Sequence, residues 1–173
     1  SLIIKTEIIM ETTAKQTQPQ VVSPAELLEH WQGHRRVTRR TIEAFPEDAF
    51  FNHAIGGMRP FYKMVMELLA IAEPGLREIT GDKPESFDEE FKHEKNKEYF
   101  LKLWDDATEA INTLWAKLKP EQFQENITLF GQYEGTVYLQ ISYFIDNEIH
   151  HRAQGYVYLR SLGIEPPLFY MRD

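Results

Sequence analysis

The sequence predicts an all-α protein that folds as a single four-helix bundle. Four long segments carry apolar residues at three- and four-residue steps, the spacing of an amphipathic helix, and helix start or stop signals bound them. One connection between them is long enough to cross the bundle, as in many proteins of this class. A chain of 173 residues, of which 42% are hydrophobic, is large enough to bury one core.

The chain is expected to divide into an N-terminal arm, residues 1–22, and a bundle domain, residues 23–173. The arm ends in a polar stretch, residues 15–20, and shows little periodicity. Such a segment lacks the regular apolar face that packs against a core, which predicts an extended and flexible conformation. The rest of the chain contains no internal repeat and no second linker.

The first helix is predicted to begin at Pro24 and to run to about Ala44. Ser23 suits the N-cap and Pro24 the first helical position, while Glu26 completes a capping box with Ser23. Apolar residues then follow at helical spacing, and Pro46 prevents the helix from continuing.

A second helix is predicted from about Pro60 to about Ile79, after the break at Gly56-Gly57. Its residues are apolar nearly all round, which is typical of a helix buried on most of its faces. Glu67 is an isolated charge in the middle of this apolar run. The following residues, 80–92, contain glycine, proline and mixed charges and are expected to form a loop.

The third helix is predicted from Asn96 to Leu118, because apolar residues again recur at helical spacing until Pro120. The region after it shows no clear periodicity. Within it, residues 127–130 favour a short extended piece before Gly131.

The fourth helix is predicted from about Gly135 or Thr136 to Leu162, with Gly163 as its C-terminal glycine. An apolar segment, residues 168–170, is expected to fold back onto the bundle as a short C-terminal tail. One line of residues along this helix forms an apolar stripe with two polar members near its middle: Phe144, Asn147, His151, Gly155, Tyr158 and Leu162.

The two polar members of this stripe, Asn147 and His151, need partners. Burying an amide and an imidazole without hydrogen bonds costs a few kcal/mol. A metal, a ligand or a local hydrogen-bond network would each satisfy them, and the spacing alone leaves the three alternatives open.

Composition limits the classes of partner. A net charge of −8 and a pI near 5.3 argue against nucleic-acid binding and against docking on anionic membranes. The chain has no cysteine, which excludes disulfides and thiolate metal sites. No apolar run reaches the ~18 residues of a membrane span. We therefore expect a soluble, cytoplasmic protein.

Several other polar groups are expected to lie away from the core. His30 and His34 lie four residues apart on the first helix, near several arginines, and are expected on a polar or interface face. Glu148 and Arg152 are suited to a salt bridge along another face of the fourth helix. His53 is expected to be a solvated loop residue.

The motif His150-His151-Arg152-Ala153-Gln154, followed by residues 158–163 and Pro166-Pro167, resembles the fourth-helix motif H-x-x-H-H-R-G-Q of the DinB family. The resemblance implies a bundle of DinB/YfiT-like type over residues 23–165. It also implies that the protein is a homodimer.

The resemblance further implies a divalent metal held by three histidines, and the corresponding positions here are Glu67, Asn147 and His151. Two of these three positions do not carry histidine, and Ala153 replaces the usual glycine. A carboxylate, an amide oxygen and an imidazole can still bind Ni²⁺, Zn²⁺ or Mn²⁺, with weaker affinity expected from the amide.

Two functions follow from this resemblance. The first is a divalent-metal-dependent hydrolase or low-molecular-weight-thiol transferase with a degenerate metal site that acts on a small molecule. The alternative is a non-catalytic homodimeric binding or regulatory module. In that case Glu67, Asn147 and His151 form a buried structural triad, in which Glu67 hydrogen-bonds both Asn147 and His151 and the imidazolium satisfies the carboxylate.

Overall fold

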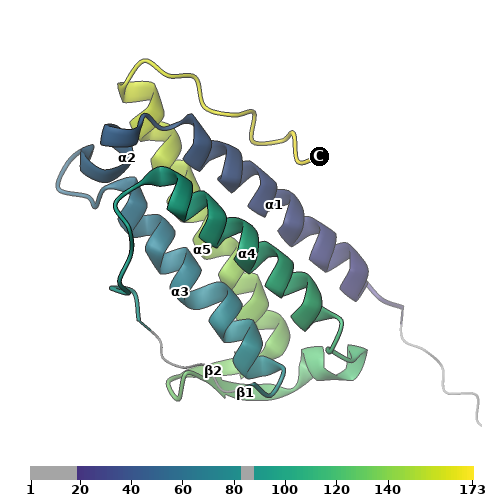
Figure 1. Cartoon of the computed structure of the whole chain (residues 1–173). Helices are drawn as coiled ribbons and strands as arrows, with labels where there is room; N and C mark the ends of the chain where they lie inside the picture. Colours follow the sequence, from purple (N-terminus) through teal and green to yellow (C-terminus); the bar gives the residue numbers. More distant parts are fainter. Residues whose placement is uncertain (1–18, 83–87) are drawn as a thin grey trace, which may run out of the picture.

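The computed structural model describes residues 19–82 and 88–173, and it confirms the predicted all-α four-helix bundle. α1 packs against α4 and α5, and α3 packs against the same two helices, so that α1 and α3 occupy opposite corners (Figure 1). The four long helices are α1 (Pro24–Ala44), α3 (Phe61–Ile79), α4 (Lys97–Trp115) and α5 (Val137–Ser161).

The predicted capping groups are present at the helix ends. The Glu26 backbone N–H donates to Ser23 Oγ over 3.2 Å, and the Ser23 N–H donates to a Glu26 carboxylate oxygen over 2.8 Å. The Thr136 hydroxyl accepts from the Leu139 N–H at the start of α5. Gly163 has a φ of 76°, the left-handed conformation that glycine adopts at low cost after a helix.

Three small elements were not predicted. A short helix, α2 (Glu47–Asn52), buries two phenylalanines between α1 and α3, and a 3₁₀ turn spans Pro120–Gln124. The extended piece expected at residues 127–130 is one strand of an antiparallel hairpin, β1 (Asn126–Leu129) and β2 (Tyr133–Thr136). The expectation was incomplete because β2, with one glycine and one aromatic residue among its four, carries no alternating apolar pattern.

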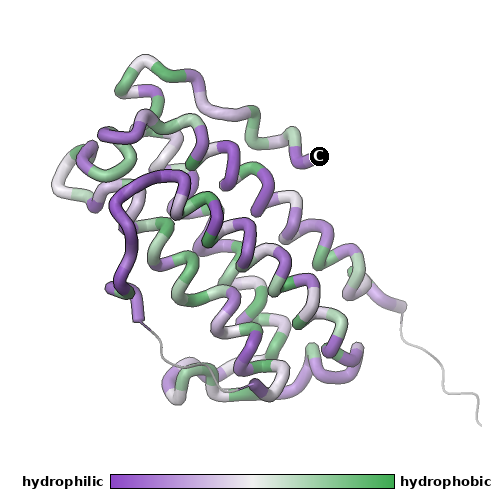
Figure 2. Tube along the Cα trace, viewed as in Figure 1, coloured by the Kyte–Doolittle hydropathy of each residue, from purple (hydrophilic) through white to green (hydrophobic). Residues whose placement is uncertain are grey.

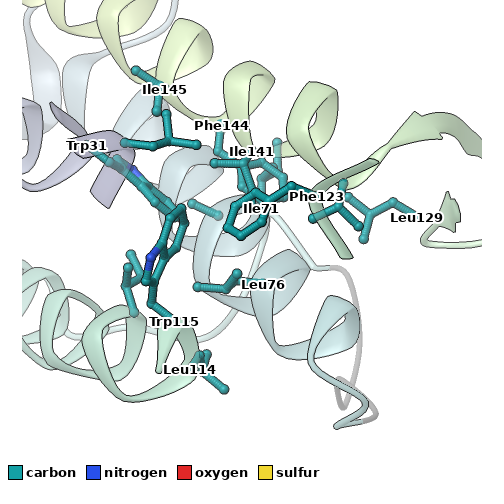
Figure 3. Close-up of a cluster of buried hydrophobic side chains, with 14 residues drawn as sticks. Trp31, Ile71, Leu76, Leu114, Trp115, Phe123, Leu129, Ile141, Phe144 and Ile145 are labelled. Carbon is teal, nitrogen blue, oxygen red and sulfur yellow. The ribbon is translucent and has the colours of Figure 1, made fainter. Parts of the chain in front are cut away.

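The core consists of two apolar clusters, one toward each end of the bundle. The cluster near the hairpin centres on Trp31, whose ring lies 6.1 Å from Trp115 and 6.0 Å from Phe144, centroid to centroid (Figure 3). The other cluster, beside α2, contains Phe50 and Phe100. α3 contributes to both, and hydrophobic residues are prominent along this helix in Figure 2.

α3 and α5 approach each other closely at two glycine–phenylalanine contacts. A Cβ added to Gly155 of α5 would lie 2.6 Å from Cε2 of Phe61 on α3. Toward the other end of the pair, a Cβ added to Gly75 of α3 would lie 2.5 Å from Cζ of Phe144 on α5. Each helix thus supplies a glycine where the other supplies a phenyl ring, and side chains between these two contacts face each other across the interface.

The two ends of the chain differ. Of the predicted N-terminal arm, residues 1–18 lie outside the described residues, and residues 19–22 form neither helix nor strand. The C-terminal tail runs beside α1 (Figure 1), where Arg40 donates to the carbonyl of Asp173 over 2.8 Å. The tail therefore folds back as predicted, but Leu168, Phe169 and Tyr170 each remain more than half exposed. Within the described ranges, no helix is long and apolar enough to cross a membrane.

Candidate functional site

The structure brings Glu67 and His151 into direct contact. Both lie between the two glycine contacts that hold α3 and α5 together, one on each helix. His151 Nε2 is 3.0 Å from Glu67 Oε1, and the two side chains are only 8% and 14% exposed. The carboxylate in the apolar middle of α3 therefore meets the imidazole that interrupts the apolar stripe of α5.

Arg59 is a third member of the site that the sequence did not reveal. Its Nη2 donates to Glu67 Oε2 over 2.6 Å, from the loop between α2 and α3. The hydroxyl of Tyr158 on α5 donates to the Arg59 carbonyl over 2.8 Å and fixes that loop against the bundle. The only available signal was indirect, because a carboxylate in an apolar helix requires a cationic or hydrogen-bonding partner.

The ionisation of Glu67 follows from these contacts. Partial burial acts to raise the pKa of this carboxyl group, but the hydrogen bonds from Arg59 and His151 and their positive charges lower it more. The net pKa lies below its ordinary value. Glu67 is therefore a carboxylate at neutral pH, with one oxygen directed to a guanidinium and the other to an imidazole.

Asn147 lies one turn before His151 on the same face of α5 and is 8% exposed. Among the described residues, neither its Nδ2 nor His151 Nδ1 has a hydrogen-bond partner. In the predicted metal-free triad Glu67 hydrogen-bonds both Asn147 and His151, but in the structure it bonds His151 and not Asn147. The site thus contains two buried polar atoms that no neighbouring side chain satisfies, which is uncommon in a folded protein.

A cavity of about 510 Å³ lies beside Glu67, between α3, the hairpin and the first half of α5. Its wall includes Tyr143, which lies one turn before Asn147 on α5. Glu67 thus contributes both to the buried pair with His151 and to the wall of a cavity that a small molecule can reach. Cavities of this size accommodate small organic ligands.

A separate buried polar cluster joins α1 to α5 and corrects two expectations. His34 is not on a polar face but is 3% exposed, and its Nδ1 is 2.9 Å from Arg152 Nη2. Glu148 does not pair along its own helix with Arg152. It accepts from Thr38 Oγ1 over 2.6 Å and lies 3.9 Å from Arg35.

This cluster has a defined charge state. Burial lowers the pKa of His34 to about 3, and the positive charge of Arg152 acts in the same direction. The imidazole is therefore neutral, so that its Nδ1 accepts the hydrogen bond from Arg152. Both expectations were wrong because α1 presents polar groups to α5, which a helix considered by itself cannot reveal.

His53 lies apart from the Glu67 site. Its Nε2 is 2.8 Å from Ser161 Oγ, and that hydroxyl donates to the carbonyl of Tyr158. The serine proton is thus held by a backbone carbonyl, so the imidazole serves as a hydrogen-bond donor. His53 therefore anchors the end of α5 to the loop after α2.

A model of the DinB family matches residues 10–173. The chain belongs to the DinB family. Two solved structures of DinB-like proteins resemble it over 84% of its length. The one from Bacillus subtilis, YjoA, is covered over 99% of its chain at 21% identity, with a TM-score of 0.69. The one from Bacillus cereus ATCC 10987 is covered over 97% at 14% identity, with a TM-score of 0.68. No curated protein matches the sequence significantly.

These similarities establish the DinB fold and leave the chemistry to be argued from the site. In the part of the chain that the structure describes, no three histidine, cysteine, aspartate or glutamate side chains are grouped so that they could hold a metal ion. The predicted metal site contains two such groups, Glu67 and His151. A metal there would need the amide of Asn147 as its third protein ligand.

Proposed function

We propose that this DinB protein binds a divalent cation, Ni²⁺, Zn²⁺ or Mn²⁺, between Glu67, His151 and the amide oxygen of Asn147. The observation that carries the proposal is the 3.0 Å separation of Glu67 Oε1 and His151 Nε2, since Glu67 also lines the cavity. The reaction classes it fits are hydrolysis of a small molecule and transfer of a low-molecular-weight thiol.

The donor set fits a cation on two grounds. Bonds from a zinc ion to oxygen and nitrogen ligands are about 2.0–2.2 Å, so two donors that share the ion lie roughly 3 Å apart or slightly more. Glu67 and His151 are spaced in this way. The unsatisfied amide of Asn147 is the second ground, since the oxygen and nitrogen of this group exchange places when the amide turns over.

Each residue has a defined role in this proposal. Arg59 holds one oxygen of Glu67 and leaves the other for the cation. His151 must be unprotonated at Nε2 to act as a ligand, so cation binding weakens as the imidazole becomes protonated. The apolar and aromatic residues in the wall of the cavity, among them Ile71 and Phe144, would pack against the substrate. A bound divalent ion would supply Lewis acidity and lower the pKa of a water molecule bound to it.

Metal analysis of untagged protein tests the proposal. The wild type is loaded with each ion, desalted and measured by mass spectrometry of the metal. About one ion per chain is expected, falling strongly in Glu67→Gln and His151→Gln, whereas Glu109→Gln on the exposed face of α4 retains it. Absence of stoichiometric metal in the loaded wild type would overturn the proposal.

The second candidate function is a non-catalytic binding or regulatory module, and the contact with Arg59 favours it. The Arg59 guanidinium lies 2.6 Å from the Glu67 carboxylate and already neutralises its charge. A metal cation bound beside Glu67 would be repelled by this guanidinium. In this case Glu67→Gln and His151→Gln lower the free energy of unfolding but change no metal content. Sedimentation of the wild type tests the accompanying homodimer, which a monomer at micromolar concentration would exclude.

A further inference from the structure

The cavity beside Glu67 is lined by acidic side chains from three segments. Glu67 comes from α3, Glu89 from the segment before α4, and Glu134 from β2. No lysine, arginine or histidine side chain is among the described residues that line it. Arg59 neutralises Glu67 from outside this wall, so the cavity itself presents only negative charge.

Two of these carboxylates are free to bind a ligand. Among the described residues, neither Glu89 nor Glu134 takes part in an ion pair or a side-chain hydrogen bond, whereas the neighbouring Glu90 pairs with Lys63. Bringing carboxylates together around one cavity without a counter-charge is unfavourable, and a cation that enters the cavity relieves this repulsion.

Aromatic rings complete the wall. Tyr133 of β2 and Tyr143 of α5 both line the cavity, and each is 52% exposed. The face of such a ring attracts a cation by its quadrupole, and organic ammonium groups gain from this more than strongly hydrated metal ions do. Burial raises the pKa of Tyr143, and the charges of Glu67 and Glu89 act in the same direction, which reflects the negative potential in the cavity.

We propose that this cavity binds an organic cation, a molecule with an ammonium group on an aromatic or apolar body. The carboxylates of Glu89 and Glu134 and the ring of Tyr143 would contact the ammonium group, while Ile71 and Leu139 would pack against the body. The inference rests on the proposed function in one respect, because it takes this cavity as the substrate site. Binding of the cation itself requires no metal.

Three probes that share one aromatic body separate charge from shape. They are 2-phenylethylammonium, the neutral 2-phenylethanol and the anionic 3-phenylpropionate, titrated calorimetrically into protein first treated with a chelator and then loaded with Ni²⁺. The ammonium compound is expected to bind about tenfold more tightly than the alcohol, with the carboxylate weakest. Equal affinity for the ammonium compound and the alcohol, or preference for the carboxylate, would overturn the proposal.

Substitutions in the wall locate the binding. The double variant Glu89→Gln, Glu134→Gln is expected to weaken ammonium binding about three- to tenfold, and Tyr143→Leu about threefold, since the latter keeps apolar bulk but removes the ring face. Glu109→Gln changes the net charge on the far face and should leave the affinity unchanged. Loss of affinity in Glu109→Gln equal to that in the double variant would place the effect in overall charge and contradict the site.

The same variants distinguish this proposal from the metal proposal. Glu89 and Glu134 are not among the three proposed ligands, so the double variant should retain its metal content while losing ammonium binding. If the wild type binds no stoichiometric metal but still prefers the ammonium compound, only the proposed function is overturned. Normal metal content without ammonium selectivity would overturn only the cation inference.

Discussion

Arg59 and His151 share the carboxylate of Glu67, and in the proposed metal site this sharing sets the affinity for the ion. The guanidinium keeps the pKa of Glu67 low and also repels any second positive charge that approaches it. Replacement by glutamine preserves a hydrogen-bond donor and removes the charge.

We therefore expect Arg59→Gln to raise the affinity of the site for Ni²⁺ by about tenfold, as judged from the Coulomb energy of charges a few ångströms apart. Titration of the variant and the wild type against a competing chelator measures this ratio. Lys63→Gln, which removes a charge paired with Glu90 instead, is the matched control. An unchanged or reduced affinity in Arg59→Gln would show that the guanidinium does not compete with a metal.

His34 should make folding sensitive to pH. Its pKa is about 3 in the folded protein and 6.5 in the unfolded chain, so between these values the unfolded state binds a proton that the folded state does not. Stability is therefore complete above pH 6.5 and falls as the pH decreases toward 3. The loss from this group between pH 7 and pH 5 is about 2 kcal/mol.

Denaturant unfolding at a series of pH values measures this loss. His34→Asn, whose amide oxygen can accept from Arg152 without titrating, should reduce the dependence on pH over this range. The substitution His30→Asn, at an exposed neighbouring position on α1, should leave most of the pH dependence in place. An equally steep dependence in His34→Asn would assign the effect to other groups.

Residues were predictable where the helix alone determined their environment. The apolar stripe of α5 made Asn147 and His151 conspicuous, and the apolar run of α3 did the same for Glu67. Arg59 was not predictable, because it reaches Glu67 from a loop eight residues away in sequence. His34 was misplaced for a related reason, since its partner Arg152 is on another helix.

At the level of elements, the glycine contacts between α3 and α5 set the spacing of the candidate site. Gly155→Ala would place a methyl group within 3.0 Å of three atoms of the Phe61 ring. We expect a loss of about 1–3 kcal/mol in the free energy of unfolding, because overpacking forces the helices apart despite the better helix propensity of alanine. Chemical denaturation of the variant measures it.

A compensating substitution tests whether this contact is the cause. Phe61→Leu in the Gly155→Ala background removes part of the ring that the methyl group meets, and should recover some of the lost stability. The two substitutions should then be less than additive, since they act on one contact. Strict additivity would mean that the cost of Gly155→Ala arises elsewhere on α5.

Long elements were predictable and short ones were not. The capping box at Ser23 and the glycine at Gly163 identified the start of α1 and the end of α5, since both signals are local. The six residues of α2 are too few to show helical periodicity, and they are stabilised mainly by burying Phe50 and Phe51. The hairpin depends on a turn in which Phe130 and Gly131 both have positive φ. Only the glycine is a recognisable turn signal.

For the molecule as a whole, periodicity and length predicted the bundle because four amphipathic helices have few other ways to bury their apolar faces. Whether the bundle binds a metal depends on whether the attraction of the cation to Glu67 exceeds its repulsion by Arg59. The fold alone does not determine this difference. Binding to the folded state alone must raise stability, because the unfolded chain has no assembled site.

We therefore expect Ni²⁺ at 100 times its dissociation constant to stabilise the protein by about 2.7 kcal/mol. For a domain of this size this corresponds to a rise of about 5–10 °C in the melting temperature. Calorimetry with and without the ion measures it, with Glu67→Gln as the test and Glu109→Gln as the control. Exposed histidines such as His30 and His150 also bind Ni²⁺ weakly. An equal rise in Glu67→Gln would thus assign the stabilisation to the surface rather than to the buried pair.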